Sequence, residues 1–247
     1  MWELWVAPAR GGEAHRFIAV RLPVSATRAS WSKASGLIAF TGTYRDGRNT
    51  VWLVNSDGSD AHELKVPDQS LDLVYPAWYP SGRELAVMDG HHLVIKRIDL
   101  RDSAIDTLTD HARVLTGMPA VSPDGRWIAF AGQRNQGEPY DQRRNSIWLL
   151  SAATHAWTPL EKGAPQGRAP SWAPDGSRLA FESSRDGLGF LYAAYLVDRD
   201  GTHLQRVSGF PLNATHPVWA PDGRRLAFAA TEIEDPGVSR IALVQLE

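Results

Sequence analysis

A pattern of about a dozen residues recurs five times along the chain and constrains the fold more than any other feature. The copies read ASWSKASGLIAF from Ala29, PAWYPSGRELAV from Pro76, PAVSPDGRWIAF from Pro119, PSWAPDGSRLAF from Pro170 and PVWAPDGRRLAF from Pro217. Their marker positions, Trp31, Trp78, Val121, Trp172 and Trp219, are separated by 47, 43, 51 and 47 residues. A period in the forties is typical of four-stranded propeller blades, and it is too long for leucine-rich, ankyrin or tetratricopeptide repeats.

The local chemistry of the copies indicates β-structure. Pro-Asp-Gly at 123–125, 174–176 and 221–223 is tight-turn sequence, because proline presets φ and glycine supplies a positive φ. In the fourth copy Leu179 and Phe181 fall on one face of a strand and Ala180 on the other. A second strand–turn–strand segment follows at 50–66, 146–160 and 193–207. Two hairpins make one blade, so we predict an all-β propeller of four-stranded blades that forms a single domain over residues 1–247.

The ends of the chain predict how the ring closes. The last copy ends at 239–247 after a third strand, and an unpaired blade edge is an aggregation liability. Residues 2–24 read as strand–turn–strand, so we expect them to complete the terminal blade by pairing of N- and C-terminal strands. The repeats, which start near 29, 76, 119, 170 and 217, then give five blades. Six blades remain possible if the chain is part of something longer.

The motif also resembles that of a known family. The element P-x-W-S-P-D-G-x-x-[IL]-A-F, followed by R-D-G and I-W-L-x-x-x-D-G, is similar to the PD40 (WD40-like) repeat of TolB-like β-propellers, from about Ala29 to the end of the chain. Lys33-Ala34-Ser35 and Val121 depart from it. The family includes the periplasmic propeller of the Tol system, propeller domains of prolyl-peptidase-like enzymes and oligogalacturonate lyases. The resemblance therefore implies the fold and leaves the activity open.

Composition excludes several classes of function. The chain has no cysteine, so disulfides, thiolate chemistry and cysteine zinc sites are excluded. A net charge of −2 provides no global field for nucleic acid. The apolar run FLYAAYLV, at 190–197, is far shorter than the ~20 residues of a membrane helix, so we expect no membrane insertion. The opening MWELWVAPARGG does not read as a secretory signal. The expected compartment is the periplasm if a signal peptide has been removed and the cytoplasm otherwise; the oligomeric state stays open.

Candidate binding residues lie in the loops that should join the second and third strands of each blade. These segments are 41–49, 88–92, 131–145, 183–190 and 231–237, and the third is the longest interruption of the repeat. Loop insertions on a rigid scaffold commonly carry function. The candidate partner-binding residues are Arg134, Tyr140, Arg143 and Arg144 in the longest loop, with Arg45, Arg185, His91 and His92 in others. The alternative interpretation is a self-paired polar loop, with Arg45 and Arg185 serving turn structure.

Catalytic motifs are not found in the sequence. There is no G-x-S-x-G elbow, no Walker loop and no dinucleotide fingerprint. His15, His62, His155 and His203 fall at outer turns, whereas His91, His92, His111 and His216 could meet above the channel, as metal-binding histidines do in the lyase relatives. We therefore expect a non-enzymatic module for a protein, peptide or glycan partner, with no catalytic residues, metal or cofactor. The alternatives are a metal-dependent lyase or hydrolase-type enzyme and an accessory propeller domain of a larger protein.

Overall fold

The computed structural model describes residues 3–18, 22–160, 166–186, 191–209, 212–234 and 237–246. This part of the chain is built of antiparallel strands, and its helix is limited to one short 3-10 turn, η1 (Gln142–Arg144). None of these ranges therefore holds a helix with the length and apolar character of a membrane span. The chain divides into two compact units, Met1–Thr109 and Asp110–Glu247, which are described in turn.

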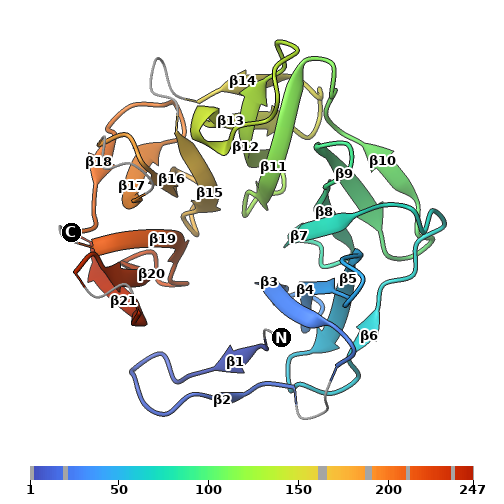
Figure 1. The fold of residues 1–247 in the computed structure, drawn as a ribbon, viewed down its shortest axis with the longest axis horizontal. Coiled ribbons are helices and arrows are strands. Elements are labelled where there is room, and N and C mark those ends of the chain that lie inside the picture. Colours follow the sequence, from blue (N-terminus) through green and yellow to red (C-terminus); the bar gives the residue numbers. More distant parts are fainter. Residues whose placement is uncertain are drawn as a thin grey trace. The chain divides into compact units, whose positions relative to one another are not determined.

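The first unit holds two four-stranded blades, each in meander order (Figure 1). The strands of the first blade are β3 (Ser25–Trp31), β4 (Leu37–Thr43), β5 (Asn49–Asn55) and β6 (His62–Glu63). Those of the second blade are β7 (Leu73–Trp78), β8 (Glu84–Asp89), β9 (Val94–Asp99) and β10 (Ile105–Thr107). The two predicted hairpins per copy are therefore the four strands of one sheet.

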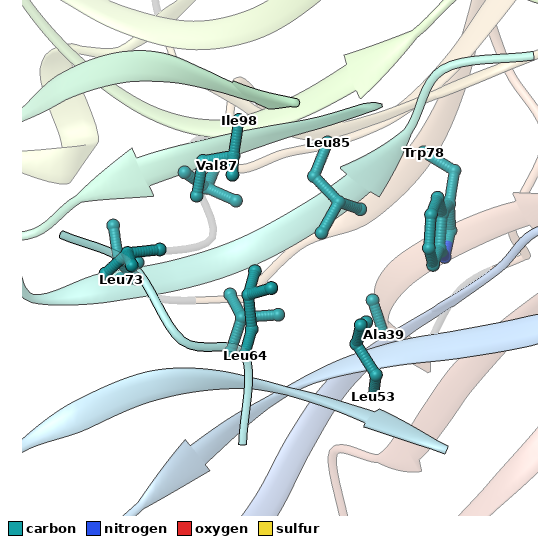
Figure 2. Close-up of a cluster of buried hydrophobic side chains, with 10 residues drawn as sticks. Ala39, Leu53, Leu64, Leu73, Trp78, Leu85, Val87 and Ile98 are labelled. Atoms are coloured by element: carbon teal, nitrogen blue, oxygen red, sulfur yellow. The ribbon is translucent and has the colours of Figure 1, made fainter. Parts of the chain in front are cut away.

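Large and small apolar side chains interleave between these two blades. Figure 2 shows Ala39 and Leu53 of the first blade opposite Leu85 and Trp78 of the second. The indole Nε1 of Trp78 donates a hydrogen bond of 3.0 Å to the carbonyl oxygen of Ser30 in the first blade. Fully burying one aliphatic side chain, such as that of Leu85, stabilises the fold by about 1.5–3 kcal/mol. Trp78 is therefore both a core residue and a hydrogen-bonded link between the first and second blades.

The N-terminal hairpin belongs to the first unit. Strand β1 (Trp5–Val6) pairs with β2 (His15–Arg16), and these two strands form a sheet of their own. Leu4, Phe17 and Ile18 belong to the apolar cluster of the first blade. No described sheet includes the expected pairing of residues 2–24 with the terminal blade, so closure by that pairing stays a prediction.

The second unit holds three more sheets. The third blade consists of β11 (Val114–Val121), β12 (Trp127–Arg134), β13 (Ser146–Ser151) and β14 (Trp157–Pro159). The fourth blade consists of β15 (Gly167–Trp172), β16 (Arg178–Ser183), β17 (Ala193–Asp198) and β18 (Gln205–Arg206). The fifth has three strands within the described residues, β19 (Leu212–Trp219), β20 (Arg225–Glu232) and β21 (Ser239–Gln245).

The first strand of every blade contains the same irregularity. Its register with the second strand shifts by one residue three positions before the marker residue of the repeat. The residue there has a left-handed backbone: Arg28 (φ 54°), Tyr75 (54°), Met118 (52°), Ala169 (49°) and His216 (53°). In four of the five copies a proline follows, and a bulge suits proline because it needs no ladder N–H there. The bulge exposes backbone donors towards the preceding blade: the Tyr75 N–H donates to Thr41 Oγ1 at 3.0 Å.

Candidate functional site

The long loop between β12 and β13 is held in place by its own polar residues. The side chain of Gln133, which is buried at the end of β12, accepts a hydrogen bond of 2.8 Å from the backbone N–H of Asp141. Asp141 in turn caps η1 by accepting from the N–H of Arg143 at 3.0 Å. The buried amide of Asn145 donates to the hydroxyl of Tyr140 at 2.8 Å. The loop is therefore an ordered insertion with a defined surface.

Most of the loop's charged groups are paired within it. The Arg143 guanidinium donates hydrogen bonds to both oxygens of the Asp141 carboxylate, with 2.7 Å between Nη2 and Oδ2. These bonds hold the pKa of Asp141 below its ordinary value. Arg144 forms an ion pair with Glu138. This pairing matches the self-paired interpretation for two of the four arginine and tyrosine candidates in this loop.

An open pocket of about 310 Å³ lies beside the loop, at the end of the third blade. Residues of β12, the loop, β13 and β14 line it: Gly132, Gln133, Arg134, Gln136, Glu138, Arg144, Ser146, Trp148 and Pro159. The Arg134 guanidinium lies 5.1 Å from the centroid of the Trp148 ring. A Cβ atom at Gly132 would lie 2.8 Å from Cδ1 of that ring, so glycine is what lets the indole lie against the strand. The pocket thus combines an aromatic wall with cationic and amide groups.

A second polar cluster lies where the fourth and fifth blades and the loop meet. Glu182 on β16 is completely buried, and its carboxylate accepts hydrogen bonds from Nε of Arg168 and from the backbone N–H of His216. The Arg168 side chain is 14% exposed, and its guanidinium also donates to the side-chain oxygen of Gln142 in η1. The same guanidinium lies 4.1 Å from the ring centroid of Tyr192. Through Arg168, the cluster therefore connects the β12–β13 loop to the fourth blade.

Sequence reasoning missed this cluster, although a signal was present. The residue after the buried aromatic or valine of the second strand is Thr41, Met88, Ala131 or Ala229 in the other copies and Glu182 in the fourth. The cross-strand neighbour of Glu182 is Arg168. At the equivalent positions of the second blade, Met88 pairs with Val74. A charged residue at a repeat position that is otherwise uncharged indicates a buried polar contact, because a buried charge requires a partner.

The other candidate residues lie on separate loops. Arg45 is exposed in the β4–β5 turn, and His91 is exposed in the β8–β9 turn. His92 Nδ1 lies 2.8 Å from the carboxylate of the buried Asp89. Arg185 stacks 4.8 Å from the Tyr195 ring centroid in the fourth blade. Gly187, in the same predicted loop, lies outside the described residues. The structure therefore brings together Arg134 and Arg144 at one pocket.

A metal centre has no support in the described part of the chain. Within those residues, no group of three or more histidine, aspartate or glutamate side chains could hold a metal ion. His203 Nδ1 lies 2.8 Å from the Asp198 carboxylate at an outer turn, and His216 Nδ1 lies 3.8 Å from Glu182. Each of these two histidines thus lies beside a carboxylate.

Comparison with known proteins gives matches in sequence and in fold. A family model described as PD40, TolB beta propeller domain, matches residues 119–244. The "Uncharacterized peptidase YuxL" of Bacillus subtilis is 30% identical over 100 residues, which are 40% of this chain and 15% of that protein. The "Tol-Pal system protein TolB" of Alcanivorax borkumensis is 38% identical over 69 residues, 28% of this chain and 14% of that protein. The chain thus spans a small part of the length of these relatives.

Among solved structures, a TolB-like protein of Agrobacterium tumefaciens matches with a TM-score of 0.76 and 17% identity, over 94% of this chain and 80% of that one. An identity this low supports the fold alone. The prediction of an all-β, five-bladed propeller with four-stranded antiparallel blades is confirmed.

Proposed function

We propose that this chain, which belongs to the PD40 family of TolB β-propeller domains, is a non-enzymatic interaction module. It binds a protein, peptide or glycan partner through loops that join the second and third strands of its blades. The observation that supports this proposal is the pocket beside the β12–β13 loop, where the repeat is interrupted by its longest insertion. Loops carried on rigid strands are suited to recognition, because the scaffold limits the entropy lost when a partner is bound.

The candidate residues have different roles in this proposal. Arg134 and Arg144 line the pocket and contact the partner, and arginine beside an aromatic ring is a common binding hot spot. Tyr140 and Arg143 shape the loop through their contacts with Asn145 and Asp141. Arg45, His91, His92 and Arg185 remain predictions for the other loops.

Site-specific photo-crosslinking tests the proposal. A photoreactive residue replaces Gln136 at the pocket, and a matched control replaces Ala153, which is exposed in the β13–β14 turn of the same blade. We expect a discrete crosslinked partner, identified by mass spectrometry, from position 136 and none from position 153. The wild-type chain should then bind that purified partner more tightly than an Arg134→Ala variant. Equal crosslinking from both positions would contradict the proposal.

A further inference from the structure

Three blades contain the same arrangement at the position that forms the pocket in the third blade. In each, the aromatic residue of the third strand stacks on the phenylalanine of the second strand: Phe40 with Trp52 at 6.3 Å, Phe130 with Trp148 at 6.3 Å and Phe181 with Tyr195 at 5.8 Å between centroids. On the fourth strand, the residue paired with this aromatic residue is Glu63 in the first blade, Pro159 in the third and Arg206 in the fourth. The three blades can therefore be compared position by position.

In the first blade a carboxylate of the chain itself fills this position. Glu63 accepts hydrogen bonds from Nη1 of Arg48 at 3.0 Å and from the hydroxyl of Tyr44 at 3.2 Å. The Arg48 guanidinium stacks 4.0 Å from the Tyr44 ring centroid, and that ring lies against Trp52. The Glu63 side chain is only 13% exposed. The aromatic ring, the guanidinium and the carboxylate form one closed unit.

The fourth blade reaches the same result with different residues. Asp186 accepts hydrogen bonds from the hydroxyl of Tyr195 and from Nη1 of Arg206, the latter at 2.7 Å. Arg185 stacks over the Tyr195 ring. A carboxylate again lies beside an aromatic ring and a guanidinium, although it comes from a different element of the blade.

In the third blade no carboxylate of the described residues pairs with the arginine that lies on the aromatic ring, because Glu138 of the pocket lining pairs with Arg144 instead. Pro159 stands where the first blade has Glu63, and the two loop carboxylates, Glu138 and Asp141, are paired with Arg144 and Arg143. Within the described ranges no carboxylate lies at salt-bridge distance from Arg134, which contacts the Trp148 ring instead. In the corresponding place the third blade has the open pocket.

The charge and shape of the pocket indicate what would fill it. Arg134, Arg144 and Glu138 give its lining one net positive charge, and Gln136 and Ser146 add hydrogen-bonding groups. Trp148 and Pro159 supply apolar surface on which the methylene groups of a ligand can lie. A guanidinium that is stacked on an aromatic ring is preorganised for a carboxylate, because its planar fork matches the two oxygens.

We infer that this pocket binds a glutamate or aspartate side chain of a partner polypeptide, which supplies the carboxylate that the chain itself supplies in the first and fourth blades. The inference deepens the proposed function by naming the chemistry of the partner at the pocket, and it rests on that proposal. The carboxylate of the partner side chain pairs with Arg134, and the methylene groups of that side chain lie against Trp148 and Pro159.

An NMR titration of the full chain tests this inference. The probe is a terminally blocked peptide with two adjacent glutamates in a glycine–serine background, compared with the same peptide carrying glutamines and with free glutarate. The reporter is the indole N–H signal of Trp148, which is assigned with a Trp148→Phe variant and which donates to the Gly132 carbonyl at 2.9 Å beside the pocket. We expect the glutamate peptide to shift this signal saturably and to bind about tenfold or more tightly than the glutamine peptide.

Matched variants separate the pocket from general charge. Arg134→Met should weaken binding of the glutamate peptide about tenfold or more, and Arg134→Lys should restore part of it. Arg126→Met, which removes an exposed cation from the β11–β12 turn of the same blade, should change the affinity less than about twofold. Urea unfolding of each variant checks that the fold is retained.

The outcomes are distinguishable. A shift with glutarate but not with the peptide would overturn the polypeptide as the source of the carboxylate. If neither carboxylate probe shifts the signal while crosslinking at position 136 recovers a partner, the inference is wrong and the proposed function stands. If both experiments fail, both are wrong.

Discussion

The Arg168–Glu182 pair tests whether a buried charge in a blade is stabilised by its partner. The second blade has two uncharged residues, Val74 and Met88, at the same pair of positions. Glu182→Met introduces the residue that the second blade has there, and it leaves Arg168, whose side chain is 14% exposed, without its carboxylate. Removing one partner of a buried ion pair costs about 3–5 kcal/mol. Because Arg168 keeps some contact with solvent, we expect the lower end, about 3 kcal/mol, which lowers Tm by roughly 6–12 °C in a chain of this size.

The double variant Arg168→Val with Glu182→Met copies the Val74–Met88 pair into the fourth blade. It should recover most of the stability, because no unpaired charge remains. A deficit of about 1–2 kcal/mol should persist, since the backbone N–H of His216 loses its acceptor.

Urea unfolding followed by tryptophan fluorescence measures all three variants, including Arg168→Val alone. The reasoning is refuted if Glu182→Met costs less than about 1 kcal/mol, or if the double variant is as unstable as either single variant. The first result would mean that the ion pair contributes no more than a solvent-exposed one. The second would mean that the two side chains do not interact energetically.

Three further outcomes follow from the structure. Burial alone would raise the pKa of Glu63. The hydrogen bonds from Lys65 and Arg48 lower it by more, so the pKa lies below 4.5. Glu63 therefore stabilises the fold above its unfolded-state pKa, and the cost of Glu63→Gln, measured by urea unfolding at several pH values, should shrink as the pH falls below 4.5. Gly132→Ala places a Cβ atom 2.8 Å from the Trp148 ring and should cost about 1–3 kcal/mol, with a shift of the Trp148 indole N–H signal in NMR. Ile241, 76% exposed on β21, should tolerate Ile241→Lys within about 0.5 kcal/mol, with less aggregation measured by light scattering.

The sequence predicted the blades because their information is local. Pro-Asp-Gly turns, two-residue alternation and the repeat period each depend on neighbouring residues, and the structure has strands on both sides of each turn. Leu179 and Phe181 indeed pack in one cluster and Ala180 in another. The fourth strands proved short: β18, for example, covers only Gln205–Arg206.

The site was predicted less completely, because its contacts depend on the path of the loop and on the register of the strands, which the repeat period does not give. Arg134 could be singled out as a loop arginine, but its place against Trp148 depends on Gly132, which lets the ring approach the strand. The ion pairs of Arg143 and Arg144 depend on the path of the loop around η1. The buried Glu182 is paired through a cross-strand register that becomes visible only when the blades are aligned.

The bulge of each first strand has a consequence for anyone who builds an idealised protein from this repeat. The five blades place arginine, tyrosine, methionine, alanine and histidine there, so averaging their letters would suggest that any residue is acceptable. What is copied is a left-handed turn of the main chain, which valine, isoleucine and threonine strongly resist. A consensus design should therefore exclude β-branched side chains from this position and can use glycine or asparagine, although none of the five copies contains either.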